Sequence, residues 1–282
     1  GDIIILNKIA YGPKLPRNAY DIPLINILFY LYDHRLESIN DEWWPYLRMS
    51  GISEIKKGDI VVFQMSKKFS LVKRCIAISG DTLSITKGKI YVNNIEYNDP
   101  KSVKNKYILK VKGQGNIYKY ANGLNLRTDL NKNGDSFNYF EGNLSKSQKL
   151  KILKLPEIMS IEKYQDTFTK NKNLFFRNDN LSWTMDKMGP FVIPKRNMTI
   201  SLNMYNYQLY EKVIIEGEQV KFRMKNGVFY IDGRKQEEYT FTKDYYFFLG
   251  DNRDCSKDSR FLGSVGYVHK DNLVGKARII FF

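Results

Sequence analysis

The sequence GDNRDCSKDSR, residues Gly250–Arg260, follows directly on the apolar run YYFFL, residues Tyr245–Leu249. A short aromatic run of this kind is typical of a β-strand. Gly and Asn then allow the backbone to turn tightly where the strand ends. Asp and Arg side chains two or three positions apart can lock such a loop with charge-assisted hydrogen bonds. On composition alone a loop this polar is most often a structural turn, so a functional interpretation needs support from elsewhere in the chain.

Short runs rich in β-branched and aromatic residues recur outside this loop and predict strands joined by tight turns. Two hairpins are the clearest, one turning at Thr86–Gly88 and the other at Asn226–Gly227. Because only two copies exist, we interpret them as repeated hairpin chemistry and not as a solenoid. The expected strands here are Ile60–Phe63, Ser70–Ile78, Thr82–Ile85, Lys89–Asn93, Val220–Met224 and Val228–Ile231.

The middle of the chain has a different character. Lys101–Asn143 is rich in Lys, Asn and Gly and shows no clear periodicity. One short helix is expected within Leu144–Met159, beginning at Ser145. Strand character returns at 188–194 and at Met198–Leu202. We therefore predict a β-rich insertion with little helix, carried on a separate β core.

Composition narrows the classes of protein. The 282 residues are 43% hydrophobic, which suits a globular chain with a real core, and the formal net charge is +15. The positive charge is spread along the chain and no nucleic-acid-binding motif occurs, so we expect no nucleic-acid partner. The longest apolar stretch, Ile22–Tyr32, is about half the roughly 20 residues that a membrane helix needs. A partly buried loop or a short helix is the expected structure there.

Three groups of motifs, in order, carry a resemblance to a known family. GDNRDCSKDSRFLGSV at 250–265 closely resembles the C-terminal motif of type I (leader) signal peptidases. GDIIILNK at 1–8 with Tyr11-Gly12 is similar to the segment after that family's serine motif. The family's two middle motifs resemble KGDIVVF at 57–63 and VKRCI at 72–76 with Gly80-Asp81. The resemblance covers roughly residues 1–95 and 237–282.

The resemblance implies a mainly β fold with a discontinuous catalytic core. Residues 1–95 and 237–282 would form an antiparallel, partly closed β core of the signal-peptidase type. Residues 96–236 would form the insertion domain, as in the large-insert members of the family.

The histidine and cysteine content excludes several catalytic classes. The two histidines, His34 and His269, lie outside the motifs, which argues against a Ser-His-Asp triad. No His or Cys pair has the spacing of a zinc site, and we expect no metal and no cofactor. A serine–lysine pair is the remaining route to peptide hydrolysis.

Lys73 is the candidate general base, because it lies in a strand-like run whose apolar neighbours can remove it from water. A free lysine has a pKa of about 10.4, and burial must lower that pKa towards roughly 7–8 for the amine to accept a proton at neutral pH. Strand alternation places Lys73 and Arg74 on opposite faces, with Lys73 towards the substrate and Arg74 towards the loop carboxylates. The alternative is that Lys73 is an ordinary solvated lysine of a strand face.

The resemblance assigns the remaining roles. Ser256 would orient Lys73, Asp258 would hold the loop by pairing with Arg260 or Arg74, and Val72 would line the pocket for small substrate side chains. The nucleophilic serine, together with the oxyanion donors, would lie upstream of Gly1. We therefore expect that the chain as given does not cleave peptides.

The implied protein is a membrane-anchored serine endopeptidase, a hydrolase of protein secretion that removes signal peptides from exported preproteins after small-x-small sites such as Ala-x-Ala. Its partners would be those signal peptides and membrane lipids. It would lie in the bacterial cytoplasmic (inner) membrane with the catalytic domain on the outer, periplasmic side, and Trp43 or Trp44 could rest at the bilayer interface. Two alternatives stay open: a self-cleaving repressor-type Ser-Lys peptidase, and a non-catalytic basic binding module on the same scaffold.

The two cysteines, Cys75 and Cys255, both fall in the motifs that the resemblance brings to one site. A disulfide between them is conceivable outside the cytoplasm. Two separate buried thiols are the favoured interpretation.

Overall fold

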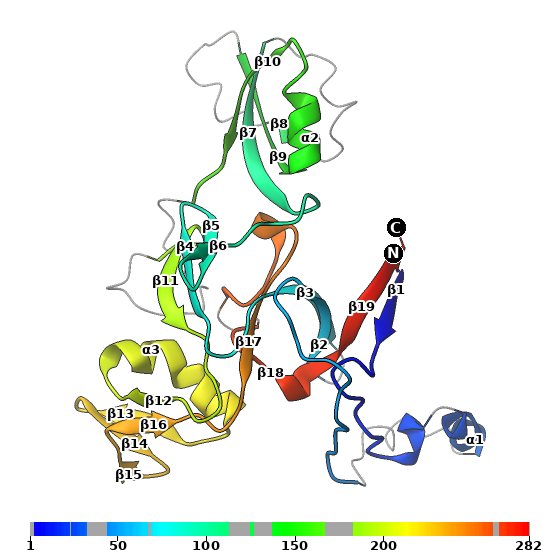
Figure 1. Ribbon diagram of the computed structural model, residues 1–282, viewed down its shortest axis with the longest axis vertical. Coiled ribbons are helices and arrows are strands. Elements are labelled where there is room, and N and C mark those ends of the chain that lie inside the picture. The colour runs from blue at the N-terminus through cyan, green and yellow to red at the C-terminus, as the bar shows by residue number, and fades with distance from the viewer. Residues whose placement is uncertain are drawn as a thin grey trace. The chain divides into compact units, whose positions relative to one another are not determined.

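The computed structural model describes residues 3–22, 24–32, 44–66, 69–112, 125–126, 137–166, 183–261 and 265–281. The chain forms two compact units, residues 1–72 with 271–282, and residues 73–270 (Figure 1). The strand β3, Phe69–Ala77, enters the second unit at Lys73.

Among the described residues, the first unit contains three whole antiparallel strands. They are β1, Ile3–Asn7, β2, Ile60–Ser66, and β19, Leu273–Phe281, and β19 pairs with both of the others. Val61, Val62 and Phe63 of β2 and Leu273 of β19 are buried, as is Tyr11, whereas Ile5 of β1 is exposed. The hydroxyl of Tyr11 donates to Asp59 Oδ2 at 2.8 Å, so the strand-joining segments are tied together through a carboxylate.

Two helical segments follow β1 in the same unit. A 3-10 turn, η1, covers Ala19–Asp21, and the α-helix α1 covers Ile25–Tyr32. The helix has the sequence INILFYLY, without a charged residue, and the side chains of Ile27, Leu28 and Leu31 are all exposed. Of the two alternatives expected for this stretch, a partly buried loop or a short helix, the short helix forms. No helix of the described residues is long and apolar enough to cross a bilayer.

The second unit is built around β17, Tyr245–Leu249, which pairs with β3 on one side and with β18, Val268–His269, on the other. A four-stranded sheet runs in the order β11, β4, β5, β6. Its strands are Lys187–Val192, Thr82–Thr86, Lys89–Val92 and Ile95–Glu96. Aromatic and aliphatic side chains of these strands form one continuous core that includes Phe191, Phe247 and Leu249.

Further elements pack on this core. The hairpin strands β13, β14 and β15 cover Phe222–Lys225, Val228–Ile231 and Arg234–Lys235, and β12, Thr199–Ser201, pairs with β16, Glu238–Thr240. The helix α3, Met204–Lys212, runs into a π-helical turn, Val213–Gly217. This helix was missed by the sequence analysis, because its aromatic residues carry no strong apolar period.

A separate four-stranded antiparallel sheet, order β10, β7, β9, β8, has its own small core (Figure 1, teal to green). Its strands are Ile158–Lys163, Lys104–Lys112, Phe137–Ser145 and Asn125–Leu126. The helix α2, Lys146–Ile152, follows β9 and buries Ile152 in that core. Its N-cap is Ser145, whose hydroxyl accepts from Gln148 N while Gln148 reaches back to Ser145 N.

The prediction of a mainly β, antiparallel fold with a β-rich insertion and little helix is confirmed. Both predicted hairpins form, and Asn226 and Gly227 adopt the positive φ values that a tight hairpin turn requires. No sheet of the described residues closes on itself. The boundaries 1–95, 96–236 and 237–282 stay a prediction, since the two compact units divide the chain at other positions.

Candidate functional site

The pairing of β3 with β17 brings the polar loop to Lys73. Leu249, the last residue of β17, pairs with Arg74 in antiparallel register, so Gly250 comes level with Lys73. The loop then makes a 3-10 turn, η6, at Arg253–Cys255 before Ser256. Lys73 and the loop are far apart in the sequence but lie close together, because the end of β17 fixes where the loop begins.

Lys73 is half-buried, and burial lowers the pKa of its amine from the ordinary value of 10.5. Asp258 acts in the opposite direction and raises this pKa, whereas the nearby Arg260 lowers it. Because the two nearby charges oppose one another, desolvation decides the direction of the shift. An amine with a lowered pKa is the form of lysine that can accept a proton.

Ser256 lies next to Lys73 at Gly250. A β-carbon built on Gly250 would lie 2.0 Å from Ser256 Oγ and 3.6 Å from Lys73 Nζ, so both atoms border the same point of the backbone. Ser256 is 8% exposed, and its Oγ has no hydrogen-bond partner among the described residues. A buried hydroxyl without a partner is costly to keep and is a mark of functional sites.

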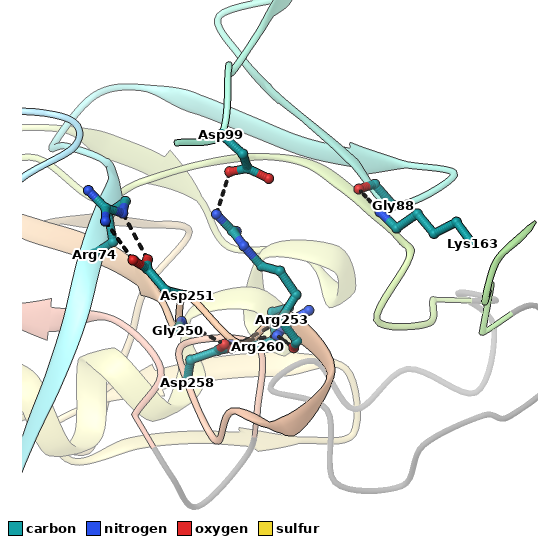
Figure 2. A network of polar contacts seen from close by, with 9 residues as sticks. All are labelled: Arg74, Gly88, Asp99, Lys163, Gly250, Asp251, Arg253, Asp258 and Arg260. Atoms are coloured by element: carbon teal, nitrogen blue, oxygen red, sulfur yellow. Dashed lines mark hydrogen bonds and ion pairs between the residues drawn. The ribbon is translucent and has the colours of Figure 1, made fainter. Parts of the chain in front are cut away.

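Asp258 is fully buried and organises the loop by accepting four hydrogen bonds (Figure 2). Its Oδ2 accepts from Gly250 N at 3.1 Å and from Arg260 Nη2 at 2.8 Å. Its Oδ1 accepts from Arg260 Nε at 2.9 Å and from Arg260 N at 3.2 Å. Burial by itself would lower the pKa of Arg260, but the charge and hydrogen bonds of Asp258 outweigh it and raise that pKa. The pair is a buried brace of the loop, in which two hydrogen bonds join the two side chains.

Arg74 pairs with Asp251 and not with Asp258. Its Nε donates to Asp251 Oδ1 at 2.8 Å and its Nη2 donates to Oδ2 at 2.6 Å, so the contact is bidentate (Figure 2). The hydrogen bonds that Arg74 donates to Asp251 raise the pKa of Arg74. Of the two partners expected for Asp258, it therefore pairs with Arg260, and Arg74 pairs with Asp251 instead.

Four residues at this site were not singled out from the sequence: Gly250, Asp251, Arg253 and Ser259. Ser259 is fully buried and its Oγ accepts from Phe248 N at 3.0 Å, which ties the loop back to β17. All four lie inside the GDNRDCSKDSR motif, so the motif was the available signal. Which polar residue bonds to which backbone group depends on loop conformation, which the motif does not show.

The remaining predicted site residues lie as follows. Val72 precedes Lys73 on β3 and is 36% exposed, and its place in a substrate pocket stays a prediction. Gly1, where the expected upstream segment would join, lies outside the described residues, as do His34 and Trp43. His269 is on β18, with its ring 5.6 Å from that of Tyr245. Within the described ranges, no three His, Cys, Asp or Glu side chains gather as metal ligands would.

Cys75 and Cys255 do not form a disulfide. Cys75 is buried in β3, whereas Cys255 is exposed and its Sγ accepts from Asn143 Nδ2 at 3.1 Å. The interpretation of two separate thiols agrees with this arrangement, but the expectation that both are buried was wrong. The η6 turn presents Cys255 outwards while Arg253 points inwards.

Comparison with known proteins adds a second line of argument. The family described as "Signal peptidase, peptidase S26" matches residues 1–186 and 234–282. A "Signal peptidase I" of Aquifex aeolicus is 28% identical over 82% of this chain and 64% of its own length. A "Signal peptidase I" of Helicobacter pylori is 24% identical over the whole chain and 69% of its own length. The chain thus spans about two thirds of the length of these relatives.

Proposed function

The chain belongs to the signal peptidase family, peptidase S26, and on that premise we propose that it is the catalytic region of a type I signal peptidase. The proposed enzyme is a serine endopeptidase that removes signal peptides from exported preproteins after small-x-small sites such as Ala-x-Ala. The observation that supports this most directly is the half-buried Lys73 amine, with its lowered pKa, beside the buried Ser256 hydroxyl at Gly250.

In the proposed reaction Lys73 acts as general base. Its neutral amine takes the proton of a serine hydroxyl, and the serine oxygen forms a bond to the scissile carbonyl carbon. The lysine ammonium then gives that proton to the leaving amine as the peptide C–N bond breaks. In the second half, Lys73 takes a proton from water as the water oxygen bonds to the acyl carbon. The ammonium then gives that proton to the serine oxygen as the ester C–O bond breaks. No cofactor or metal enters any of these steps.

Ser256 and the two ion pairs serve this base in the proposal. The Ser256 hydroxyl would accept from or donate to Lys73 and set the direction of the amine. The Asp258–Arg260 pair would hold the loop without exchanging protons, because an arginine stays charged and Asp258 is already occupied by four donors. Arg74 would fix the same loop through Asp251.

The nucleophile in this proposal is a serine outside the sequence given, before Gly1, where the family's serine motif would fall. The oxyanion donors would come from the same segment. We accordingly propose that the chain by itself does not cleave peptides. This can be tested by comparing the cleavage activity of this chain with that of a protein extended by its natural preceding residues.

Substrate would bind in extended form as an added strand, held by main-chain hydrogen bonds. Shallow pockets would then accept small side chains at alternate positions, with Val72 at one of them. This proposal draws on the family and on the 36% exposure of Val72, which leaves part of its side chain available for contact.

We also propose that membrane lipids are a partner, at the outer face of a bacterial cytoplasmic membrane. The support is the uncharged helix α1, whose Leu28 and Leu31 side chains are 67% and 68% exposed. Trp44 is 43% exposed in the segment that follows. Isolated apolar side chains on a surface are ordinary, but an exposed helix without a charged residue is not.

The decisive experiment is cleavage of a preprotein by the protein extended through its natural upstream residues. Lys73→Met is expected to lower kcat by about 10²–10⁴-fold, the usual contribution of a positioned base. Lys257→Met, in an exposed lysine of the same loop, is the matched control and should keep full activity. Equal activity of native and Lys73→Met protein would remove the serine–lysine mechanism. No cleavage by any form would favour the non-catalytic binding module.

A further inference from the structure

The loop that carries Ser256 is held from a second direction, by residues of the predicted insertion, 96–236. Arg253, at the start of η6, donates from Nη2 to Asp99 Oδ1 at 2.5 Å (Figure 2). The Arg253 side chain is 5% exposed, and burial lowers its pKa while Asp99 opposes that change. Burial likewise raises the pKa of Asp99, against the charge of Arg253. Burial therefore disfavours the charged form of both groups, and their mutual attraction offsets only part of that cost.

The strand β7 adds two contacts from its backbone. Lys104 N donates to Asp251 O at 2.7 Å, and Lys106 N donates to Asp254 Oδ2 at 2.6 Å. Lys104 also forms an isolated parallel bridge with Asn252. The first residues of the loop thus contact the beginning of β7 at Asp251, Asn252 and Asp254.

The neighbouring strand β9 contributes the last contact, from Asn143 to Cys255. Asn143 and Lys106 are register partners in the β7–β9 ladder. The ladder therefore holds Asp254 through one strand and Cys255 through the other. Every residue from Asp251 to Cys255 receives a contact from the insertion side.

These contacts lie one residue short of the serine. Cys255 immediately precedes Ser256, and the carbonyl of Arg253 accepts from Arg260, the partner of Asp258. Ser256 Oγ lies close against the backbone of Gly250, since a β-carbon added there would come within 2.0 Å of it. A shift of η6 would therefore move the Ser256 hydroxyl relative to Lys73 and disturb the Asp258 brace as well.

We propose that the insertion is a clamp on the catalytic loop, in which Asp99 and the β7–β9 ladder hold η6 so that the Ser256 hydroxyl stays beside Lys73. Asp99 is then a positioning residue for the reaction, although it lies outside the motifs and touches no reacting atom. The catalytic part of this inference rests on the proposed function, whereas the clamp itself can be tested without any activity.

The test of the clamp is amide hydrogen exchange across 245–261 in the chain as given. Asp99→Asn removes the charge at constant shape, and exchange at Gly250 and Ser259 is expected to rise by about tenfold or more. Glu96→Gln is the matched control, because Glu96 ends β6 three residues before Asp99 and pairs with the exposed Lys89. It should leave exchange in the loop unchanged. Native exchange rates in folded Asp99→Asn would overturn the clamp.

A second variant covers the case in which Asp99→Asn does not fold, as judged by exchange in the β4–β5 hairpin. Asn143→Ala removes only the contact to Cys255, from a side chain whose loss leaves no buried ion. Faster exchange confined to 251–256 would support the clamp. Unchanged exchange there would overturn it.

Kinetics of the extended protein test the positioning role. Asp99→Asn should lower kcat by about 10–10²-fold with KM nearly unchanged, because misplacing a catalytic group affects the chemical step. Asp99→Glu keeps the charge and should restore most of kcat. Native kcat in Asp99→Asn would overturn the positioning role. If the native extended protein cleaves nothing, the proposed function fails, and the exchange result still decides the clamp.

Discussion

Ser256 Oγ lies 2.0 Å from the position that a β-carbon on Gly250 would occupy, and Ser256 Cβ lies 2.4 Å from it. The residue that begins the loop therefore has to be glycine for the residue six positions later to lie where it does. The same point of the backbone is 3.6 Å from Lys73 Nζ. A close approach of backbone and side chain, not an unusual φ, is what glycine provides here.

Gly250→Ala is therefore expected to destabilise the fold by about 1–3 kcal/mol, the usual cost of overpacking a tight site. The cause can be isolated with a double-mutant cycle. In a Ser256→Gly background the added methyl group has room, so the cost of Gly250→Ala should largely disappear. Denaturant unfolding of the native chain, Gly250→Ala, Ser256→Gly and the double variant measures the cost in each background. An equal cost in both backgrounds would show that Ser256 is not the obstacle.

The lowered pKa of Lys73 predicts how stability depends on pH. Between the folded-state pKa and the ordinary value of 10.5, the unfolded chain binds more protons at this residue than the folded chain does. Stability therefore rises with pH through that interval, because the folded state keeps the amine neutral there. Lys73→Met removes this dependence, so the variant should be more stable than the native chain below the folded-state pKa.

The stability advantage of Lys73→Met should shrink as the pH approaches 10.5. Thermal unfolding between about pH 6 and pH 10 measures this stability difference. Lys257→Met, at an exposed lysine, is the matched control. A constant difference in stability between Lys73→Met and the native chain across that range would mean that the pKa of Lys73 is the same in the folded and unfolded states.

The exposed helix α1 predicts binding to lipid vesicles. Leu31→Gln should weaken binding about tenfold, since burying a leucine side chain contributes roughly 1.5–3 kcal/mol. Ile95→Gln is the control, because Ile95 is 73% exposed on another element and Leu31 is 68% exposed. Vesicle co-sedimentation is the measurement. Equal loss in both variants would point to general surface hydrophobicity and not to α1.

The two cysteines predict a simple pattern of alkylation. Cys255 is exposed and should react in the folded chain, whereas Cys75 is fully buried and should react only after unfolding. Mass measurement should therefore find one added group before denaturation and two after it. The result should be the same with and without reductant. Addition of no group without reductant would reveal a disulfide.

The sequence predicted those elements that are stabilised by interactions between residues close together in the chain. The hairpin turn at Asn226–Gly227 and the helix start at Ser145 each depend on residues within four positions. The helix α3 was missed for the opposite reason. Its buried side chains, such as Leu209 and Tyr210, face a core assembled from distant strands.

At the candidate site the sequence identified most of the participants and fewer of their partners. Lys73, Ser256, Asp258 and Arg260 were named from the motifs, and the structure brings them to one loop and one strand. Arg74 was expected to face the loop carboxylates, but Asp251 was not named as its partner. Asp99, which lies outside every motif, was not foreseen. An ion pair such as Arg253–Asp99 joins residues 154 positions apart, and no local pattern encodes such a distance.

The sequence by itself determined the strand and turn pattern, the family and the chemical types available to the site, because these follow from neighbouring residues and from motifs in order. Only the tertiary structure decided which carboxylate each arginine takes, how deeply Lys73 is buried, and that Cys255 and α1 face solvent. Ion pairing and desolvation depend on distances across the fold, which are set by the register between β3 and β17 and by the contacts of β7 with the loop.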